Sequence, residues 1–247
     1  KVESIGFSAF HGCKSLKEIS IPFSVKVMDR EVFSSCSKLE KVFLPTSLKS
    51  IPKNTFDECI SLIDIQIPSS IGCIEDNAFS GCSSLNKIVI PSSVSKIGMK
   101  AFCNCTSLEE ITISSSVLQI GNNAFEGCKS LTHISIPDSV VEIGENVFKS
   151  CSSLDQIQLS SSLLSINQYF FSKCSSLKQI SVPSSVTSIN SYAFNECDLL
   201  AEVLIPSSVT SINKYAFYRC HNLQEVIVPP DSELDCNFFS IFLMFQI

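Results

Sequence analysis

Phenylalanine and cysteine recur along this chain at a constant interval of 23 residues. Cysteine stands three residues after each repeated phenylalanine, and the phenylalanines occupy positions 10, 33, 56, 79, 102, 125, 148, 171, 194 and 217. A fixed interval of this size indicates a solenoid, because one unit is too small to bury its own apolar side and must pack it against its neighbours. Ten units in register leave no place for a boundary, so we predict one elongated domain over residues 1–230.

The composition supports a folded chain and argues against some partners. Hydrophobic residues make up 45% of the sequence and charged residues 17%, which is sufficient for a continuous core. The formal net charge is −6, and the only arginines are Arg30 and Arg219. A chain with this charge lacks the basic surface that a nucleic acid or an anionic membrane would require. We therefore expect a protein partner and no nucleic acid.

Each unit contains a segment of the form Leu-x-x-Ile-x-Ile, of which Leu131, Ile134 and Ile136 are one example. Alternation of apolar and polar residues predicts a strand with one buried face, and repetition of the unit predicts a parallel sheet of about ten short strands. Proline, which cannot donate to a strand ladder, ends the segment in most units. Ser114 and Ser160 replace it in two units, and proline stands at 22, 45, 68, 91, 137, 183, 206 and 229.

A serine follows the proline in a fixed place between two apolar columns, where a column is the set of residues that share one place in every unit. We expect its hydroxyl to bond the turn backbone or the adjacent coil, a structural role in preference to a catalytic one. These serines are at positions 24, 47, 70, 93, 116, 139, 162, 185 and 208.

Glycine or asparagine precedes the phenylalanine in many units, at Gly98, Gly121, Gly144, Asn167, Asn190 and Asn213. Both residue types tolerate the left-handed backbone conformation. Phenylalanine and cysteine three residues apart lie on one side of a helical turn. These residues can therefore lead into the segment that holds the phenylalanine and cysteine, and we predict one short helix or 3₁₀ turn there in each unit.

The sequence holds thirteen cysteines, ten of them in the repeated column. We expect these ten to be buried free thiols, because disulfides along the column would draw coils together in pairs and spoil their spacing. Cys73, Cys103 and Cys236 lie outside the column and have no assigned role. Neither the Cys103–Cys105 pair nor the histidines beside the repeated cysteines have zinc-site spacing, so no metal or cofactor site is predicted.

The full pattern, Leu-x-x-Ile-x-Ile-Pro-x-Ser-Val-x-x-Ile-Gly-x-x-Ala-Phe-x-x-Cys, resembles the BspA-like class of leucine-rich repeat proteins over residues 1 to about 230. The resemblance implies a curved right-handed leucine-rich repeat solenoid with its parallel sheet on the concave side and short helical or 3₁₀ turns on the convex side. It also implies a role as a surface antigen or adhesin and no catalytic residues; some relatives carry a transmembrane segment. Departures at Ser114, Ser160 and Phe170 indicate local repacking.

The repeat stops after Pro229 and Pro230, and residues 231–247 contain an apolar run. That run is shorter than the roughly 17 residues that span a bilayer. We favour a hydrophobic cap over the last coil, and the alternative is the start of a transmembrane helix. The chain also begins at Lys1 in the middle of a unit, so we expect it to be a fragment, and any membrane contact would come through a flanking segment.

The outward positions of the predicted strands supply the candidate binding residues. One outward column alternates in charge at first, from Glu18 and Lys41 to Asp64, and these charges could simply pair across neighbouring strands. The other column is mostly polar, with isolated apolar residues, although single exposed apolar residues are common. The residues proposed to contact a partner are Phe43, Val89, Leu204 and Ile227, together with His133, the only histidine within a strand.

Three functions remain open at this stage. The first is a non-catalytic protein-interaction module displayed on a cell surface, which binds a protein or host-matrix partner through the concave strands and flanking loops. The second is an intracellular, cytoplasmic scaffold, favoured by the many unpaired thiols. The third is a hydrolase, but no catalytic motif or cluster of polar residues breaks the repeat, so no enzyme is expected. The sequon Asn104-Cys105-Thr106 is a weak glycosylation signal because Cys105 belongs to the buried column.

Overall fold

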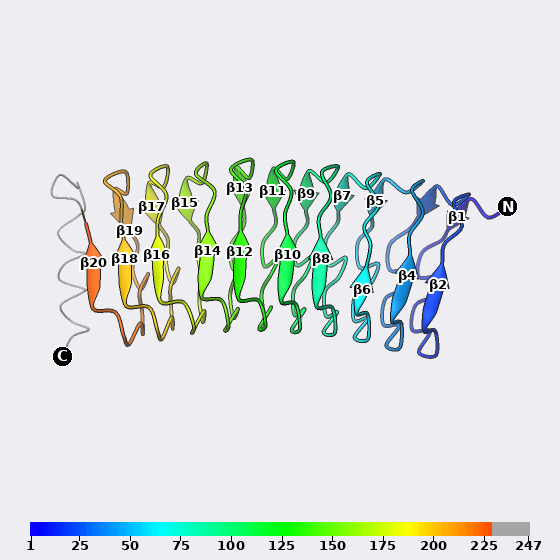
Figure 1. Cartoon of the computed structure of the whole chain (residues 1–247), viewed down its shortest axis with the longest axis horizontal. Helices are drawn as coiled ribbons and strands as arrows, with labels where there is room; N and C mark the ends of the chain where they lie inside the picture. Colours follow the sequence, from blue (N-terminus) through cyan, green and yellow to red (C-terminus); the bar gives the residue numbers. More distant parts are fainter. Residues whose placement is uncertain (229–247) are drawn as a thin grey trace.

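The computed structural model describes residues 1–228, which wind into a solenoid with parallel strands on two of its sides (Figure 1). The predicted Leu-x-x-Ile-x-Ile segments form the first set of strands, and all but β6 are three residues long. We call this side the long-strand side. Its strands are β2 (Glu18–Ser20), β4 (Lys41–Phe43), β6 (Asp64–Ile65), β8 (Lys87–Val89), β10 (Glu110–Thr112), β12 (His133–Ser135), β14 (Gln156–Gln158), β16 (Gln179–Ser181), β18 (Glu202–Leu204) and β20 (Glu225–Ile227).

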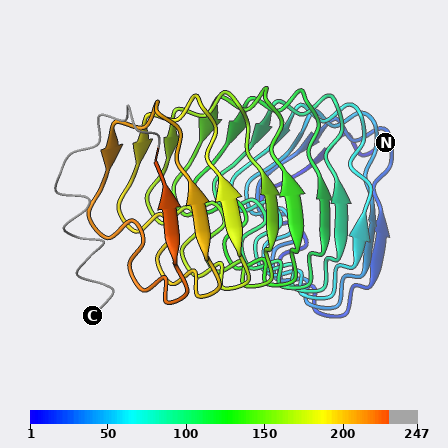
Figure 2. The ribbon, with the colours of Figure 1, turned by 60° about the vertical axis from the view of Figure 1, so that its left-hand side comes forward.

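A second set of two-residue strands forms the short-strand side, and Figure 2 shows the two sets on separate sides of each coil. The chain reaches this side after the proline and serine turn. These strands are β1 (Ser4–Ile5), β3 (Val27–Met28), β5 (Ser50–Ile51), β7 (Cys73–Ile74), β9 (Lys96–Ile97), β11 (Gln119–Ile120), β13 (Glu142–Ile143), β15 (Ser165–Ile166), β17 (Ser188–Ile189) and β19 (Ser211–Ile212).

Strand pairing keeps equivalent residues in register from coil to coil. Every pair is parallel, and partners such as Ile88 and Ile111 or Ile120 and Ile143 are 23 residues apart. The alternation predicted for the long strands is confirmed, since the central isoleucine of β8 is buried and its two neighbours are exposed. A parallel register with an offset of one unit turns each sequence column into a line of stacked side chains.

The predicted helical turn is absent: residues 1–228 contain no helix or 3₁₀ segment. Alternate backbone N–H groups instead reach the next coil, as in the bonds from Phe102 N to Ala124 O (2.8 Å) and from Asn104 N to Glu126 O (2.7 Å). An α-helix directs its N–H groups to carbonyls within its own segment, so it would remove these bonds between coils. Bonding to the next coil therefore replaces the helix.

The left-handed residues lie at two other places in each coil. The phenylalanine has one of them two residues before it and the other two residues after it, as Asn123 (φ 59°) and Gly127 (φ 74°) flank Phe125. None of the six glycines and asparagines that were noted for tolerating this conformation adopts it, and the six include Gly98, Gly121 and Gly144. Those glycines are required by close packing, because a Cβ on Gly98 would lie 2.6 Å from the Asp76 nitrogen of the preceding coil.

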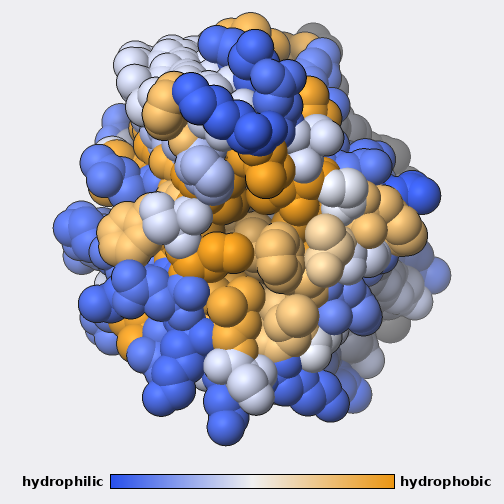
Figure 3. All heavy atoms as spheres, turned by 90° about the vertical axis from the view of Figure 1, so that its right-hand side faces the viewer, coloured by the Kyte–Doolittle hydropathy of each residue, from blue (hydrophilic) through white to orange (hydrophobic). Residues whose placement is uncertain are grey.

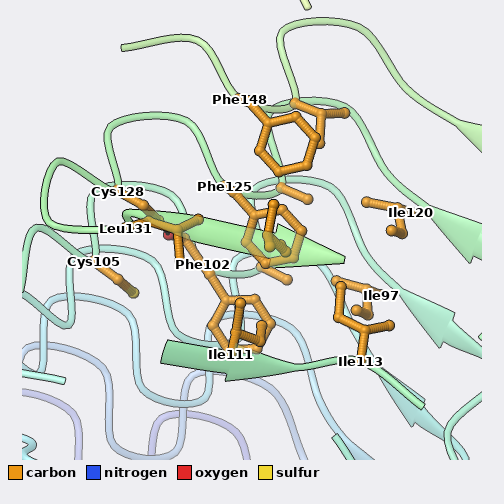
Figure 4. Packing of buried hydrophobic residues seen from close by; sticks show 14 of the residues in the cluster. Ile97, Phe102, Cys105, Ile111, Ile113, Ile120, Phe125, Cys128, Leu131 and Phe148 are labelled. Carbon is orange, nitrogen blue, oxygen red and sulfur yellow. Dashed lines mark hydrogen bonds between the residues drawn. The ribbon is translucent and has the colours of Figure 1, made fainter. Parts of the chain in front are cut away.

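The core is a stack of phenylalanines that runs through the solenoid (Figure 4). Rings of neighbouring coils lie nearly parallel, as between Phe102 and Phe125, whose centroids are 5.7 Å apart and whose planes differ by 6°. Beside the stack, every repeated thiol from Cys36 to Cys220 donates to the carbonyl of the preceding coil's phenylalanine, and the Cys128 Sγ lies 3.2 Å from the Phe102 oxygen. Phe170 shows the local repacking that was expected there, because its ring lies edge-on to that of Phe171, with an angle of 74° between the ring planes.

The serine column joins neighbouring coils, which confirms the expected bonding of these hydroxyls. Ser139 Oγ donates to the Val117 carbonyl at 2.8 Å, and Ser93, Ser116, Ser185 and Ser208 make the equivalent bond. Ser160, which replaces proline, donates to the Val140 carbonyl at 2.9 Å. The hydroxyl of Ser70 is buried and has no hydrogen-bond partner in the described part of the chain.

The predicted cap at residues 231–247 lies outside the described residues. Within residues 1–228, no helix is long and apolar enough to cross a membrane.

Candidate interaction surfaces

The five residues predicted to contact a partner all lie on the long-strand side, with His133 exposed at the start of β12. The exposed fractions of the apolar four are 54% for Phe43, 52% for Val89, 41% for Leu204 and 40% for Ile227. Their positions follow directly from the strand alternation, which turns every second side chain outward. All five are therefore accessible to a partner.

Only two of these residues are neighbours. Leu204 and Ile227 are register partners in β18 and β20, so their side chains stand side by side. Val89 is opposite Thr112, and His133 is opposite Gln156. Leu204 also borders a groove of about 300 Å³ between β14 and β18, whose other lining residues include Gln156, Gln179 and Glu202. The structure thus brings together a pair at the C-terminal end and leaves the other three apart.

The charged column on this side pairs across strands at one point in the described residues. Lys87 Nζ lies 2.8 Å from Glu110 Oε2, and both side chains are about half exposed. An exposed pair of this kind contributes about 0–1 kcal/mol, so it sets local charge more than stability. His133 Nδ1 lies 3.2 Å from the hydroxyl of Thr132, the residue directly before β12, so this contact does not join two strands.

Three exposed apolar residues lie together on the short-strand side, and the sequence analysis did not single them out. The exposed fractions are 49% for Leu118, 56% for Val141 and 67% for Leu164. They occupy one column in three consecutive coils, and we call them the apolar patch. In the remaining coils from residue 26 onward the same column holds Lys26, Lys49, Gly72, Ser95, Thr187 and Thr210.

A groove of about 480 Å³ runs beside the apolar patch. Val141 and Leu164 line it together with Gly121, Gly144 and Glu142. The two glycines allow neighbouring coils to approach closely beside the groove, because a Cβ on Gly121 would lie 2.5 Å from the Met99 nitrogen. The signal for this site was present in the sequence as an apolar run at the 23-residue spacing, but it lies outside the long strands from which the candidates were chosen.

A tyrosine stack is a second feature that the sequence analysis missed. Tyr169, Tyr192 and Tyr215 are half-buried, and their ring centroids are 5.0 and 5.1 Å apart in consecutive coils. Lys214 Nζ lies 4.7 Å from the centroid of the Tyr215 ring. The rings cover one another's faces, so the stack stabilises the left-handed turns on which these residues lie.

The cysteines form no reactive centre in residues 1–228. The twelve described cysteines are unpaired, and the repeated column is buried at eight of its ten places. The expectation of burial was wrong for Cys13, which is exposed, and for Cys220, which is half-buried, because they lie in the first and last coils of the described residues. Figure 3 shows that apolar residues are uncovered at the N-terminal end. Burial raises the pKa of the eight buried column thiols, of which Cys105 is one, and that of Cys103 to about 11. Thiols that stay protonated are poor nucleophiles and poor metal ligands.

Cys73 and Cys236 are the other cysteines outside the repeated column. Cys73 is half-buried in β7, and Cys236 lies outside the described residues. No group of three or more histidine, cysteine, aspartate or glutamate side chains in the described part could hold a metal ion. Asn104 of the glycosylation sequon is exposed, whereas Cys105 is buried as expected.

The chain belongs to the BspA type leucine-rich repeat family. Residues 1–109 and 95–224 match the profile described as "BspA type Leucine rich repeat region (6 copies)". This match confirms the resemblance drawn from the repeat pattern. No curated protein matches the chain.

Solved structures of bacterial leucine-rich repeat proteins are similar to this chain. A leucine-rich repeat protein from Bacteroides ovatus ATCC 8483 is 34% identical and has a TM-score of 0.85. The match covers 91% of this chain and 58% of the Bacteroides protein. A leucine rich cell surface protein from Faecalibacterium prausnitzii A2-165 is 33% identical, with a TM-score of 0.61 over 91% of this chain and 69% of its own. This chain therefore spans little more than half the length of the Bacteroides protein.

Proposed function

We propose that this chain is a non-catalytic protein-interaction module displayed on a cell surface. The observation that carries the proposal is the long-strand side, on which the ten strands from β2 to β20 present outward side chains and pair in register within four short sheets. The proposed contact residues are Phe43, Val89, His133, Leu204 and Ile227. An extended row of strands of this kind suits a partner with a broad surface, such as a protein of a host cell or its matrix.

Family membership supports an interaction role, because stacked repeats offer a large continuous surface. Surface display is supported by the relative from Faecalibacterium prausnitzii, which is described as a cell surface protein. The pair Leu204 and Ile227, beside the groove between β14 and β18, offers the largest apolar contact among the proposed residues. We therefore place the main contact at the C-terminal end of the long-strand side.

Binding measurements with single substitutions test this surface. Phe43→Glu and Leu204→Glu place a charge at exposed positions, so they leave the core intact. We expect Leu204→Glu to weaken binding to a confirmed protein partner at least about tenfold, the loss typical of a central contact residue, and Phe43→Glu to weaken it less. Wild-type affinity in both variants would move the contact to another side of the solenoid.

The unpaired thiols favour one alternative, an intracellular scaffold. Labelling intact source cells with a reagent that cannot cross membranes distinguishes the two. Labelling of this protein supports surface display. Labelling only after lysis supports the scaffold. The binding measurements above then still test the interaction surface, because they do not depend on where the protein is located.

A further inference from the structure

The apolar patch is one continuous surface. The Val141 N–H donates to the Leu118 carbonyl at 3.1 Å, which fixes these two residues in adjacent coils. Leu164 follows in the next coil and lines the same groove as Val141. A core position would explain apolar side chains, but all three are about half exposed or more. Contact with another molecule that buries these side chains is the simplest physical reason for three consecutive apolar residues in a column that is otherwise polar.

The surroundings of the patch carry unpaired negative charge. Asp138, Glu142 and Glu145 belong to the coil of Val141, and the one cationic side chain that lines the groove, Lys96, forms no ion pair with any of them in residues 1–228. The Glu142 carboxylate accepts a bond from the neutral Gln119 amide at 2.7 Å. Five acidic residues elsewhere in the described part pair with cationic side chains or with histidine, among them Asp76 with Lys53 and Glu126 with Lys149, at 2.8 and 2.9 Å. Three carboxylates against one lysine leave a net negative charge beside the patch, which attracts a cationic partner.

A second copy of the chain fits this surface poorly. A two-fold axis through the middle of the patch would place Val141 against itself. The same axis would bring Glu142 and Glu145 of one copy close to those of the other, and like charges in a closed interface are unfavourable. A partner with basic groups removes this repulsion.

We propose that the apolar patch and its groove bind a polypeptide segment of another protein that carries apolar side chains flanked by lysine or arginine. The apolar side chains lie on Leu118, Val141 and Leu164, and one enters the groove over Gly121 and Gly144. The basic side chains pair with Asp138, Glu142 and Glu145. This site is separate from the long-strand side, so it can fail without affecting the proposed function.

The test uses the full chain and a variant matched to its own repeats. The variant Leu118→Ser, Val141→Thr and Leu164→Thr introduces residue types that the same column carries at Ser95, Thr187 and Thr210. It should therefore fold, and equal unfolding midpoints confirm that it does. Phe43→Glu, on the long-strand side, serves as the second control. The probes are three labelled synthetic peptides of equal length, composed of leucine and lysine, serine and lysine, or leucine and glutamate.

We expect the leucine and lysine peptide to bind the wild-type chain at least about tenfold more tightly than the patch variant, and Phe43→Glu to bind it like the wild type. The double variant Glu142→Gln and Glu145→Gln should bind it more weakly and with less dependence on salt. The proposal is overturned if the patch variant binds this peptide as the wild type does. It is also overturned if the serine and lysine peptide binds equally well, or if sedimentation shows a dimer that the patch variant abolishes.

Discussion

The buried interior and the two exposed strand sides of this solenoid differ in how much their residues vary from unit to unit. In the interior, the same phenylalanine and cysteine recur in all ten units, and their side chains stack from coil to coil. On the outward sides, one column changes from Lys49 to Ser95, then to Val141 and Thr187. A buried side chain must match the shape of its neighbours above and below, whereas an exposed one need not. Repetition therefore marks stability, and departures from it mark surfaces free to acquire binding.

The largest expected effect on the repeated interior comes from alkaline pH. Burial raises the pKa of eight column thiols, among them Cys82 and Cys128, above the ordinary value of 9.0. Above about pH 9 the unfolded chain loses these protons and the folded chain retains them, so the unfolded state binds fewer protons. The free energy of unfolding then falls by about 1.4 kcal/mol per pH unit for each such thiol.

Urea unfolding at about pH 8 and about pH 10.5 measures this fall. Cys128→Ala removes one of the thiols, so its slope against pH should be shallower than that of the wild type by one thiol's share. An unchanged slope would mean that this thiol ionises alike in both states.

Phe102→Ala tests the aromatic stack at its middle. Removing a fully buried ring between Phe79 and Phe125 should lower the free energy of unfolding by about 3–5 kcal/mol. Phe10→Ala should cost less because Phe10, in the first coil, is only partly buried. Urea denaturation compares the two, and the patch variant on the outward side should unfold like the wild type. Equal losses at Phe10 and Phe102 would contradict a stack whose strength depends on burial.

Gly121→Ala tests the close approach of neighbouring coils. The added Cβ would lie 2.5 Å from the Met99 nitrogen and 2.7 Å from the Gly98 carbonyl carbon, and backbone atoms cannot move aside cheaply. We expect a loss of about 1–3 kcal/mol. Gly6→Ala is the matched control in the same column, since nothing lies within 4 Å of its Cβ. Thermal unfolding of both variants decides, and a Gly121→Ala variant as stable as Gly6→Ala would rule out the steric reason for glycine.

Ser139→Ala carries the smallest expected effect, about 1 kcal/mol, because it removes one hydrogen bond to the Val117 carbonyl. Ser70→Ala should be neutral or slightly stabilising, since the Ser70 hydroxyl is buried without a partner in the described residues. Denaturation midpoints of the two variants separate the bonded serine from the unbonded one. Equal losses would show that the column stabilises through packing alone.

The outward surfaces could be predicted only in part. Strand alternation placed Phe43, Val89, His133, Leu204 and Ile227 outside, and they are exposed. Which of them are neighbours follows from the 23-residue register, which joins Leu204 to Ile227 alone. The apolar patch was readable as a run at 23-residue spacing, but its significance required knowing that Val141 points to solvent.

The repeat by itself determined the solenoid, the parallel register and the buried phenylalanine and cysteine columns, because a fixed interval makes equivalent side chains stack. The tertiary structure decided the turn between them. A sequence such as Asn123-Ala124-Phe125 is compatible with a helical turn, but the carbonyls of the adjacent coil offer the N–H groups an alternative partner. That alternative exists only once coils are stacked, so local sequence could not reveal the two left-handed residues per coil or the close contact that requires glycine at position 121.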